Sequence, residues 1–136
     1  IINPHIMPLS EYPEGKKELI VKKGGDHHFV KDFGGGTTSE RVMLPEADGC
    51  RIKITKFRPK AGFEVKEGIV YNCDETVFVV AGQVRLHLDN GSQVDIGPGD
   101  SYHVPAGTSY GVTALTDSEV TCVFSAAADG TLADDL

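Results

Sequence analysis

Residues 71–110 decide the fold, and they read YNCDETVFVVAGQVRLHLDNGSQVDIGPGDSYHVPAGTSY. Short apolar or alternating runs are separated here by glycine, proline and asparagine, which is the pattern of successive β-strands. Asn90 and Gly91 favour a hairpin turn, because both central residues of a type I′ turn take positive φ. Pro105 ends a strand over residues 101–104, because proline cannot donate a ladder hydrogen bond. The stretch therefore predicts four short strands joined by tight turns.

The same pattern continues on both sides of this stretch. Residues 50–56 and 63–71 alternate between apolar and polar side chains, and residues 112–115 and 119–124 predict a last pair of strands. Turn signals recur about every ten residues, and no internal repeat or domain boundary interrupts them. A chain of 136 residues can bury one core without disulfides or metals. We predict an all-β protein of a single domain, with a barrel core over residues 50–125.

The two ends of the chain differ from this core. Residues 1–25 contain spaced prolines, which break helices, followed by a strand candidate over residues 18–22. We interpret this segment as an N-terminal arm. Residues 126–136 are small and acidic, and they predict a mobile tail or a short helix, because they offer little apolar surface to pack.

The central stretch resembles the cupin superfamily. That family has the motifs G-x5-H-x-H-x3-E-x6-G and G-x5-P-x-G-x2-H-x3-N, and two frames of this chain match them, Glu75-x6-Gly82 and Gly99-x5-Pro105-x-Gly107. The amino-acid sequence of residues 74–84 and 94–109 looks most like that of a histidine-poor branch of the family, which includes ethanolamine-utilisation and ureidoglycine-type cupins. The resemblance covers residues 57–113.

The resemblance implies a jelly-roll β-barrel whose inward-facing residues line a pocket open at one end. Cupin dimers commonly pack or exchange their N-terminal segments, so it also implies a homodimer. The residues at the metal-binding positions differ from the family pattern, because Ile69, Tyr71 and Tyr110 stand where the family places histidines. Only Glu75 remains of the four usual ligands. We therefore expect no metal and no other cofactor.

Glu75, Tyr71 and Tyr110 are the candidate catalytic residues. A carboxyl group buried in a barrel without a metal has a raised pKa and can act as a general acid or base. A phenol is a poor metal ligand at neutral pH, but it donates a good hydrogen bond to a carbonyl or enolate oxygen. Such groups suit proton abstraction next to a carbonyl. Tyr71 and Tyr110 can equally be ordinary aromatic residues that line a binding pocket.

His103 is a fourth candidate, because it precedes Pro105 on a strand that leads to the same motif. Tyr102 and His103 are adjacent, so only one of them faces inward, and the sequence does not decide which. The neighbouring pair His27 and His28 is interpreted as solvated. His87 shares the polar side of its strand and is expected at the surface.

Composition limits the class of partner. A net charge of −7 argues against nucleic acid or an anionic membrane, which both need clustered Lys and Arg. The three cysteines form no CxxC pair and are interpreted as reduced, inert thiols. No signal peptide or membrane-spanning run is recognisable, so we expect a cytoplasmic protein with a small-molecule ligand.

Three hypotheses remain. The first is a metal-independent lyase or isomerase that acts on a small oxygenated acid or lactone, with Glu75 as the proton carrier and the tyrosines as donors to an oxyanion. The second is a non-catalytic cupin that binds a small molecule. The third is a metal enzyme, a dioxygenase or lyase, in which Glu75 and the histidines outside the motifs (His27, His28 and His103) rebuild a site.

Overall fold

The computed structural model describes residues 18–125. The first 17 residues, which hold most of the predicted arm, and the predicted acidic tail at residues 126–136 lie outside this range. The elements in chain order are β1 (Phe29–Asp32), β2 (Thr38–Met43), α1 (Pro45–Asp48), β3 (Lys53–Arg58), β4 (Glu64–Ile69), β5 (Glu75–Ala81), β6 (Val84–His87), β7 (Gln93–Ile96), β8 (Ser101–Val104), β9 (Tyr110–Ala114) and β10 (Glu119–Phe124).

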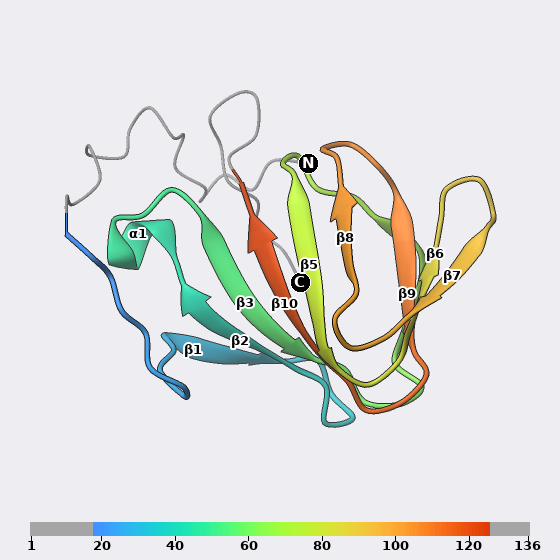
Figure 1. The fold of residues 1–136 in the computed structure, drawn as a ribbon, viewed down its shortest axis with the longest axis horizontal. Helices are drawn as coiled ribbons and strands as arrows, with labels where there is room; N and C mark the ends of the chain where they lie inside the picture. The colour runs from blue at the N-terminus through green and yellow to red at the C-terminus, as the bar shows by residue number, and fades with distance from the viewer. Residues whose placement is uncertain (1–17, 126–136) are drawn as a thin grey trace.

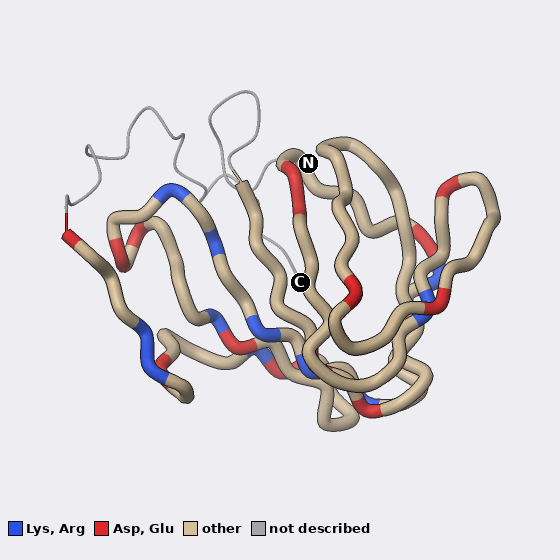
Figure 2. The backbone as a smooth tube through the Cα atoms, in the orientation of Figure 1, with Lys and Arg blue, Asp and Glu red and all other residues tan. Residues whose placement is uncertain are grey.

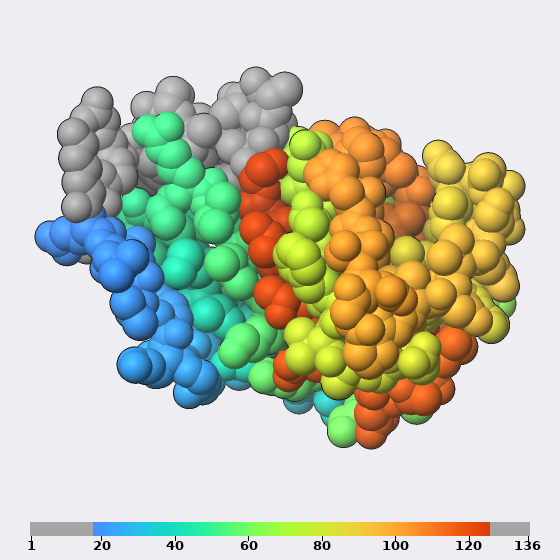
Figure 3. Space-filling view, in the orientation of Figure 1, coloured from blue at the N-terminus to red at the C-terminus, as the bar shows by residue number. Residues whose placement is uncertain are grey.

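The strands form two antiparallel sheets that face each other. The larger sheet has the order β1-β2-β3-β10-β5-β8, and the smaller has the order β4-β9-β6-β7. Figure 1 shows the larger sheet spreading from β1 to β8, with the β6–β7 hairpin at the opposite end of the molecule from β1. Figure 3 shows β10, β5 and β8 side by side on one face. The prediction of an all-β jelly-roll barrel with a single domain is confirmed.

The core lies between the two sheets and follows the two-residue period of the strands. Val77, Cys122 and Thr55 occupy one row across β5, β10 and β3, and all three are buried. Side chains on the other face of β5, such as Phe78 at 50% exposure, remain accessible to solvent. Because residues of the same parity share one face of a strand, this row shows that Glu75 also points into the barrel.

Close contact between β9 and β4 holds the strand that begins at Tyr110. A Cβ atom added to Gly111 would lie 2.2 Å from the carbonyl oxygen of Lys66, so only glycine fits there. The pairing of β4 with β9 also shifts register between Val65 and Ile69. The bulge and the missing side chain let the two backbones approach, and they direct Tyr110 towards the interior.

The prediction of a strand over residues 18–22 is wrong. These residues adopt no regular structure, and a strand needs a neighbouring edge to pair with. The segment is held instead by an ion pair between Lys22 and Asp48, with an N–O distance of 2.8 Å. The larger sheet also begins earlier than the predicted core, since β1 and β2 extend it before residue 50. Their turn contains the three glycines at 34–36, all with positive φ.

Candidate active site

Glu75 opens β5 and is buried at 2% exposure. The hydroxyl group of Tyr110 donates a hydrogen bond of 2.6 Å to its Oε1 atom. Bonds between a hydroxyl group and an ionised carboxylate have lengths of about 2.5–2.7 Å, shorter than those between neutral groups. The pair therefore has the geometry of a charge-assisted hydrogen bond inside the barrel.

Tyr71 belongs to the loop before β5 and is 9% exposed. Its ring packs edge to face against Phe124, with 5.0 Å between the centroids. The backbone N–H of Gly107 donates to the Tyr71 carbonyl oxygen at 2.8 Å, which ties this loop to the loop that precedes β9. Tyr71, Glu75 and Tyr110 line one cavity, so three of the four candidates from the sequence come together.

Tyr102 lines the same cavity, and it settles the choice left open on β8. Tyr102 pairs with Val77, whose side chain is fully buried, and Val104 on the same face is also buried. The Tyr102 ring lies edge to face with Tyr110, with 6.1 Å between the centroids. In the sequence, the apolar Val104 two residues on favoured Tyr102 as the inward-facing residue, and the pairing with β5 decides it.

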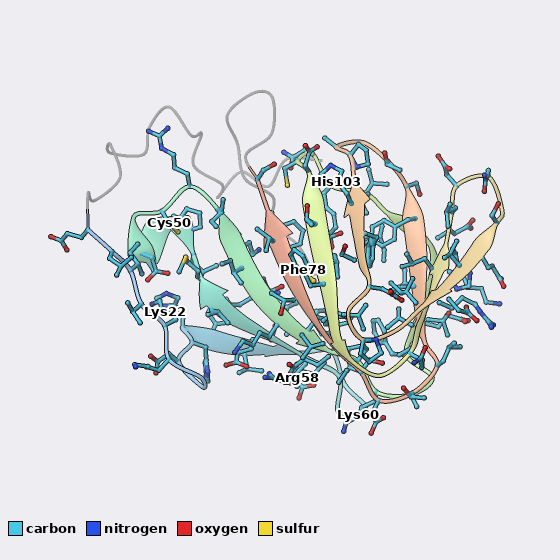
Figure 4. All side chains as sticks on the ribbon, viewed as in Figure 1. Lys22, Cys50, Arg58, Lys60, Phe78 and His103 are labelled. Carbon is cyan, nitrogen blue, oxygen red and sulfur yellow. The ribbon has the colours of Figure 1, made fainter. Side chains whose placement is uncertain are left out.

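His103 lies on the other face of β8. It pairs in register with Thr76, and its Nδ1 atom lies 2.9 Å from the Thr76 hydroxyl oxygen. Its side chain is 53% exposed, with the Nε2 atom 3.8 Å from an Asp74 carboxylate oxygen. Figure 4 labels His103 at the upper end of the strands beside β5. The structure therefore keeps His103 out of the cavity that Glu75 and Tyr71 line, although His103 and Tyr110 both line the outer pocket.

The two central phenols stay protonated at neutral pH. Burial raises the pKa of Tyr110 far above its ordinary value, and the nearby Tyr102 and Glu75 add to the effect. Burial also raises the pKa of Tyr102, together with the Glu75 charge, while hydrogen bonding with Tyr110 acts in the opposite direction. Both side chains are therefore hydrogen-bond donors, and a free phenolate is disfavoured at either position.

Two adjoining cavities meet at these tyrosines. The inner cavity has a volume of 30 Å³, which is room for water and too little for a substrate. The outer pocket has a volume of 350 Å³, within the range of small-molecule sites. Tyr102 and Tyr110 line both, whereas Glu75 and Tyr71 line only the inner cavity. A molecule in the outer pocket thus meets the tyrosines first, with Glu75 behind them.

Most of this site lies in a segment that matches a known protein family. The family profile described as "Cupin domain" matches residues 71–125. This segment is a cupin domain, and the described chain has the cupin fold. The matched segment holds Tyr71, Glu75, Tyr102 and Tyr110. It therefore includes the hydrogen-bonded pair of Glu75 and Tyr110 and both tyrosines that line the two cavities. No curated protein sequence matches this cupin.

Solved structures similar to this cupin include several of other cupins. KdgF from Halomonas sp. is 25% identical with a TM-score of 0.61, and the match covers 72% of this chain and 87% of that chain. Ectoine synthase from P. lautus is 27% identical with a TM-score of 0.59, over 65% of this chain and 63% of that chain. A protein named ethanolamine utilization protein Q from Salmonella typhimurium is 18% identical with a TM-score of 0.58, over 65% and 68%, and that likeness shows the fold alone.

The donor set of this cupin does not fit the metal of the family. Ile69 carries no ligand atom and packs in the core at 6% exposure. Tyr110 donates a hydrogen bond to Glu75, and the raised pKa of its phenol opposes the phenolate form that a metal ligand needs. In residues 18–125, no group of three or more His, Cys, Asp and Glu side chains could hold a metal ion.

The histidines considered for a rebuilt metal site lie apart from Glu75. His27 contacts Glu40, with 3.1 Å between Nδ1 and Oε1, and His28 contacts Asp48, with 2.8 Å between Nε2 and Oδ2. Both are exposed, as expected, and each also contacts a carboxylate. His87 lies on the outer face of β6, where its Nε2 atom is 2.7 Å from the Thr113 hydroxyl oxygen.

Helices that could cross a membrane were sought in the described part of the chain, and none has the required length and apolar character.

Proposed function

We propose that this cupin is a lyase or isomerase that moves a proton next to a carbonyl group, without a metal, using Glu75 and the tyrosines around it. The observation that carries the proposal is the 2.6 Å hydrogen bond from Tyr110 to Glu75 at the boundary between the two cavities. It joins a buried carboxylate to a phenol that reaches the outer pocket. The substrate class is a small oxygenated compound, such as an acid or a lactone.

The proton path follows from the pKa directions. A free Tyr110 phenolate is disfavoured, so Tyr110 cannot act alone as a base. Its oxygen can accept the substrate proton only as its own proton passes to Glu75. Glu75 then ends as a neutral acid, Tyr110 is again a neutral phenol, and the substrate becomes an enolate. Return of the proton to another atom completes an isomerisation, and loss of a leaving group completes an elimination.

Tyr102 is the donor best placed to stabilise the enolate. Its raised pKa keeps the hydroxyl group protonated, and it lines the outer pocket beside Tyr110. A fixed donor aimed at a developing oxyanion lowers the barrier, because it needs no reorganisation during the reaction. Tyr71 lines only the inner cavity, so its role here is to pack and position the pair.

Exchange of α-protons tests this proposal without knowledge of the natural substrate. The probe is 2-tetralone, a ketone with acidic α-protons, incubated in D₂O and followed by ¹H NMR. We expect the protein to accelerate exchange, and Glu75→Gln to lower the rate by roughly a hundred- to ten-thousand-fold. Glu64→Gln is the matched control, because Glu64 also accepts a hydroxyl hydrogen bond, from Thr113 at 2.7 Å, but outside the barrel. Exchange that is no faster than in buffer would refute acid–base catalysis on this probe.

A second candidate function is a non-catalytic cupin that binds a small molecule. The observation in its favour is that Glu75 does not line the 350 Å³ pocket. In that case Glu75→Gln lowers the melting temperature, because a buried hydrogen-bonded carboxylate is lost, and leaves ligand affinity nearly unchanged. Measuring affinity and exchange on the same variant separates the two functions.

A further inference from the structure

We infer that the outer pocket takes a neutral, largely apolar carbonyl or phenolic compound of about two fused rings, and not a carboxylate. The inference rests on the proposed function, because it concerns the ligand of the same site. It narrows the substrate class, since it excludes the small acids and keeps neutral compounds such as ketones and lactones.

The walls of the outer pocket are apolar. Leu86, Leu88, Val94 and Ile96 from β6, β7 and the turn between them face Val104 and Pro105 from β8 and its end. Leu88 and Val94 are 39% and 44% exposed, so the pocket presents apolar surface at its mouth. Its volume of 350 Å³ is more than twice the ~150 Å³ of an engineered apolar cavity that takes up benzene. A bicyclic compound therefore fits.

Lys and Arg side chains are missing from this pocket and from the part of the chain that builds it. Its two histidines contact other side chains, His103 with Thr76 and Asp74 and His87 with Thr113 and Gln93. None of the 13 Lys and Arg residues follows Arg85 in the sequence. Figure 2 shows β8 and β9 without a basic position. Arg85 itself points to the outer face of β6, where it pairs with Asp95 at 2.8 Å. A carboxylate in the pocket would thus be desolvated without a lysine or arginine as its countercharge, which is costly.

The charges near the pocket are of the wrong sign for an anion. Asp89 lines the outer pocket, and Glu75 lies behind Tyr110. Lys66 lines a separate 390 Å³ pocket, together with Glu67 and Asp89. Lys66 is 75% exposed. The buried Lys53 lies on the inner side, with its ammonium 5.7 Å from the Phe124 ring centre, and lines neither cavity.

The polar end of the pocket suits an oxygen atom without charge. Tyr102 and Tyr110 are the two phenols at that end, and both remain protonated. A carbonyl or phenolic oxygen can accept from Tyr102, while the rest of the ligand contacts leucine, valine and isoleucine. Few convergent polar groups in an apolar pocket are typical of sites that orient a neutral ligand by one functional group.

Binding of matched probes tests the ligand class separately from turnover. Isothermal titration calorimetry compares 2-tetralone and 2-naphthol, which are neutral, with 2-naphthoate, which has the same ring system and a full negative charge at pH 7. We expect 2-naphthoate to bind at least about a hundredfold more weakly, because its carboxylate loses water without gaining a partner. Equal or tighter binding of 2-naphthoate, or no binding of either neutral probe, would overturn the inference.

Val94→Lys locates the binding in this pocket. Val94 is at the mouth, so a lysine there can keep its ammonium in water and the protein should fold. We expect the variant to bind 2-tetralone more weakly and to gain roughly tenfold in affinity for 2-naphthoate, as one countercharge is supplied. Val80→Lys is the matched control, because Val80 is 51% exposed on the outer face of β5. Equal effects of both variants would overturn the placement.

The outcomes also distinguish this inference from the proposed function. Tight binding of the neutral probes without α-proton exchange refutes the proposed catalysis and supports the ligand class. Exchange that requires Glu75, combined with a preference for 2-naphthoate, supports the catalysis and overturns the ligand class.

Discussion

The hydrogen bond between Tyr110 and Glu75 predicts a measurable coupling between the two side chains. Tyr110→Phe removes the donor of the 2.6 Å bond and keeps the ring. Hydrogen bonds to charged groups contribute about 1.5–3 kcal/mol, against about 1 kcal/mol for neutral pairs. We therefore expect Tyr110→Phe to lower the free energy of unfolding by about 2 kcal/mol in the natural protein and by about 1 kcal/mol in a Glu75→Gln background. The coupling energy is then about 1 kcal/mol.

The measurement is urea unfolding of the four proteins at pH 7 and 25 °C, followed by far-ultraviolet circular dichroism because the chain has no tryptophan. Thr113→Val provides the control. Thr113 lies on the same strand and also donates to a carboxylate, but to Glu64 on the outer face. Its effect should add to that of Glu75→Gln within about 0.5 kcal/mol. A coupling between Tyr110 and Glu75 no larger than this control would refute the charge-assisted bond.

Three further predictions concern the rest of the molecule. Burial acts to raise the pKa of Asp48, but hydrogen bonds from Lys22, the Leu44 N–H and His28 outweigh it and lower the pKa from 3.8 to about 2. Because the pKa of Asp48 is lower in the folded protein, the ionised carboxylate contributes roughly 1–2 kcal/mol to stability above pH 4, and this contribution is lost as the pH falls towards 2. In denaturant titrations, Asp48→Asn should therefore destabilise the protein at pH 7 and hardly at pH 2. Glu46→Gln, exposed on the same short helix, serves as the control, and a difference that persists at pH 2 would contradict this account. Deleting residues 1–17 leaves the Lys22 ion pair in place. We expect this deletion to convert a dimer to a monomer, measured by light scattering. A dimer that survives the deletion would exclude these residues as the dimer contact. Elemental analysis of untagged protein after dialysis should find no stoichiometric iron, zinc, manganese or nickel, and one bound equivalent would contradict the account of the donor set at Ile69, Tyr71 and Tyr110.

The proposed chemistry depends on water being kept away from a buried pair. Glu75 is 2% exposed, and Tyr102 and Tyr110 are the residues that line both the inner cavity and the outer pocket. In such an environment a hydrogen bond is stronger than in water, and an unpaired group is more costly. The same burial that raises the pKa values of the tyrosines therefore makes the pair sensitive to any change that admits solvent.

Local sequence determined the strands, their turns and the faces that side chains share. The turn between β6 and β7 contains Asn90 and Gly91, as predicted, but its type is not I′. Gly91 has φ of +86°, whereas Asn90 does not have positive φ, and the Gly91 N–H donates to the Leu88 carbonyl oxygen at 3.0 Å. Val84 and Leu86 alternate with polar residues and are buried. These features depend on neighbours within a few residues, so they can be predicted from one chain. The spacing of the two cupin motifs also selected Glu75 and Tyr110 as site residues, because the motifs describe residues at fixed distances along the chain.

Only the tertiary structure decided which faces point inward and which distant residues meet. The alternation on β8 allowed either Tyr102 or His103 inside, and pairing with the buried Val77 on β5 selected Tyr102. Glu75 and Tyr110 are 35 residues apart, and their hydrogen bond exists because β5 and β9, in opposite sheets, both direct side chains into the barrel. Residues 18–22 formed no strand, because pairing requires an edge that the local sequence does not supply. Periodicity is a local property, whereas burial and contact depend on the packing of the two sheets as a whole.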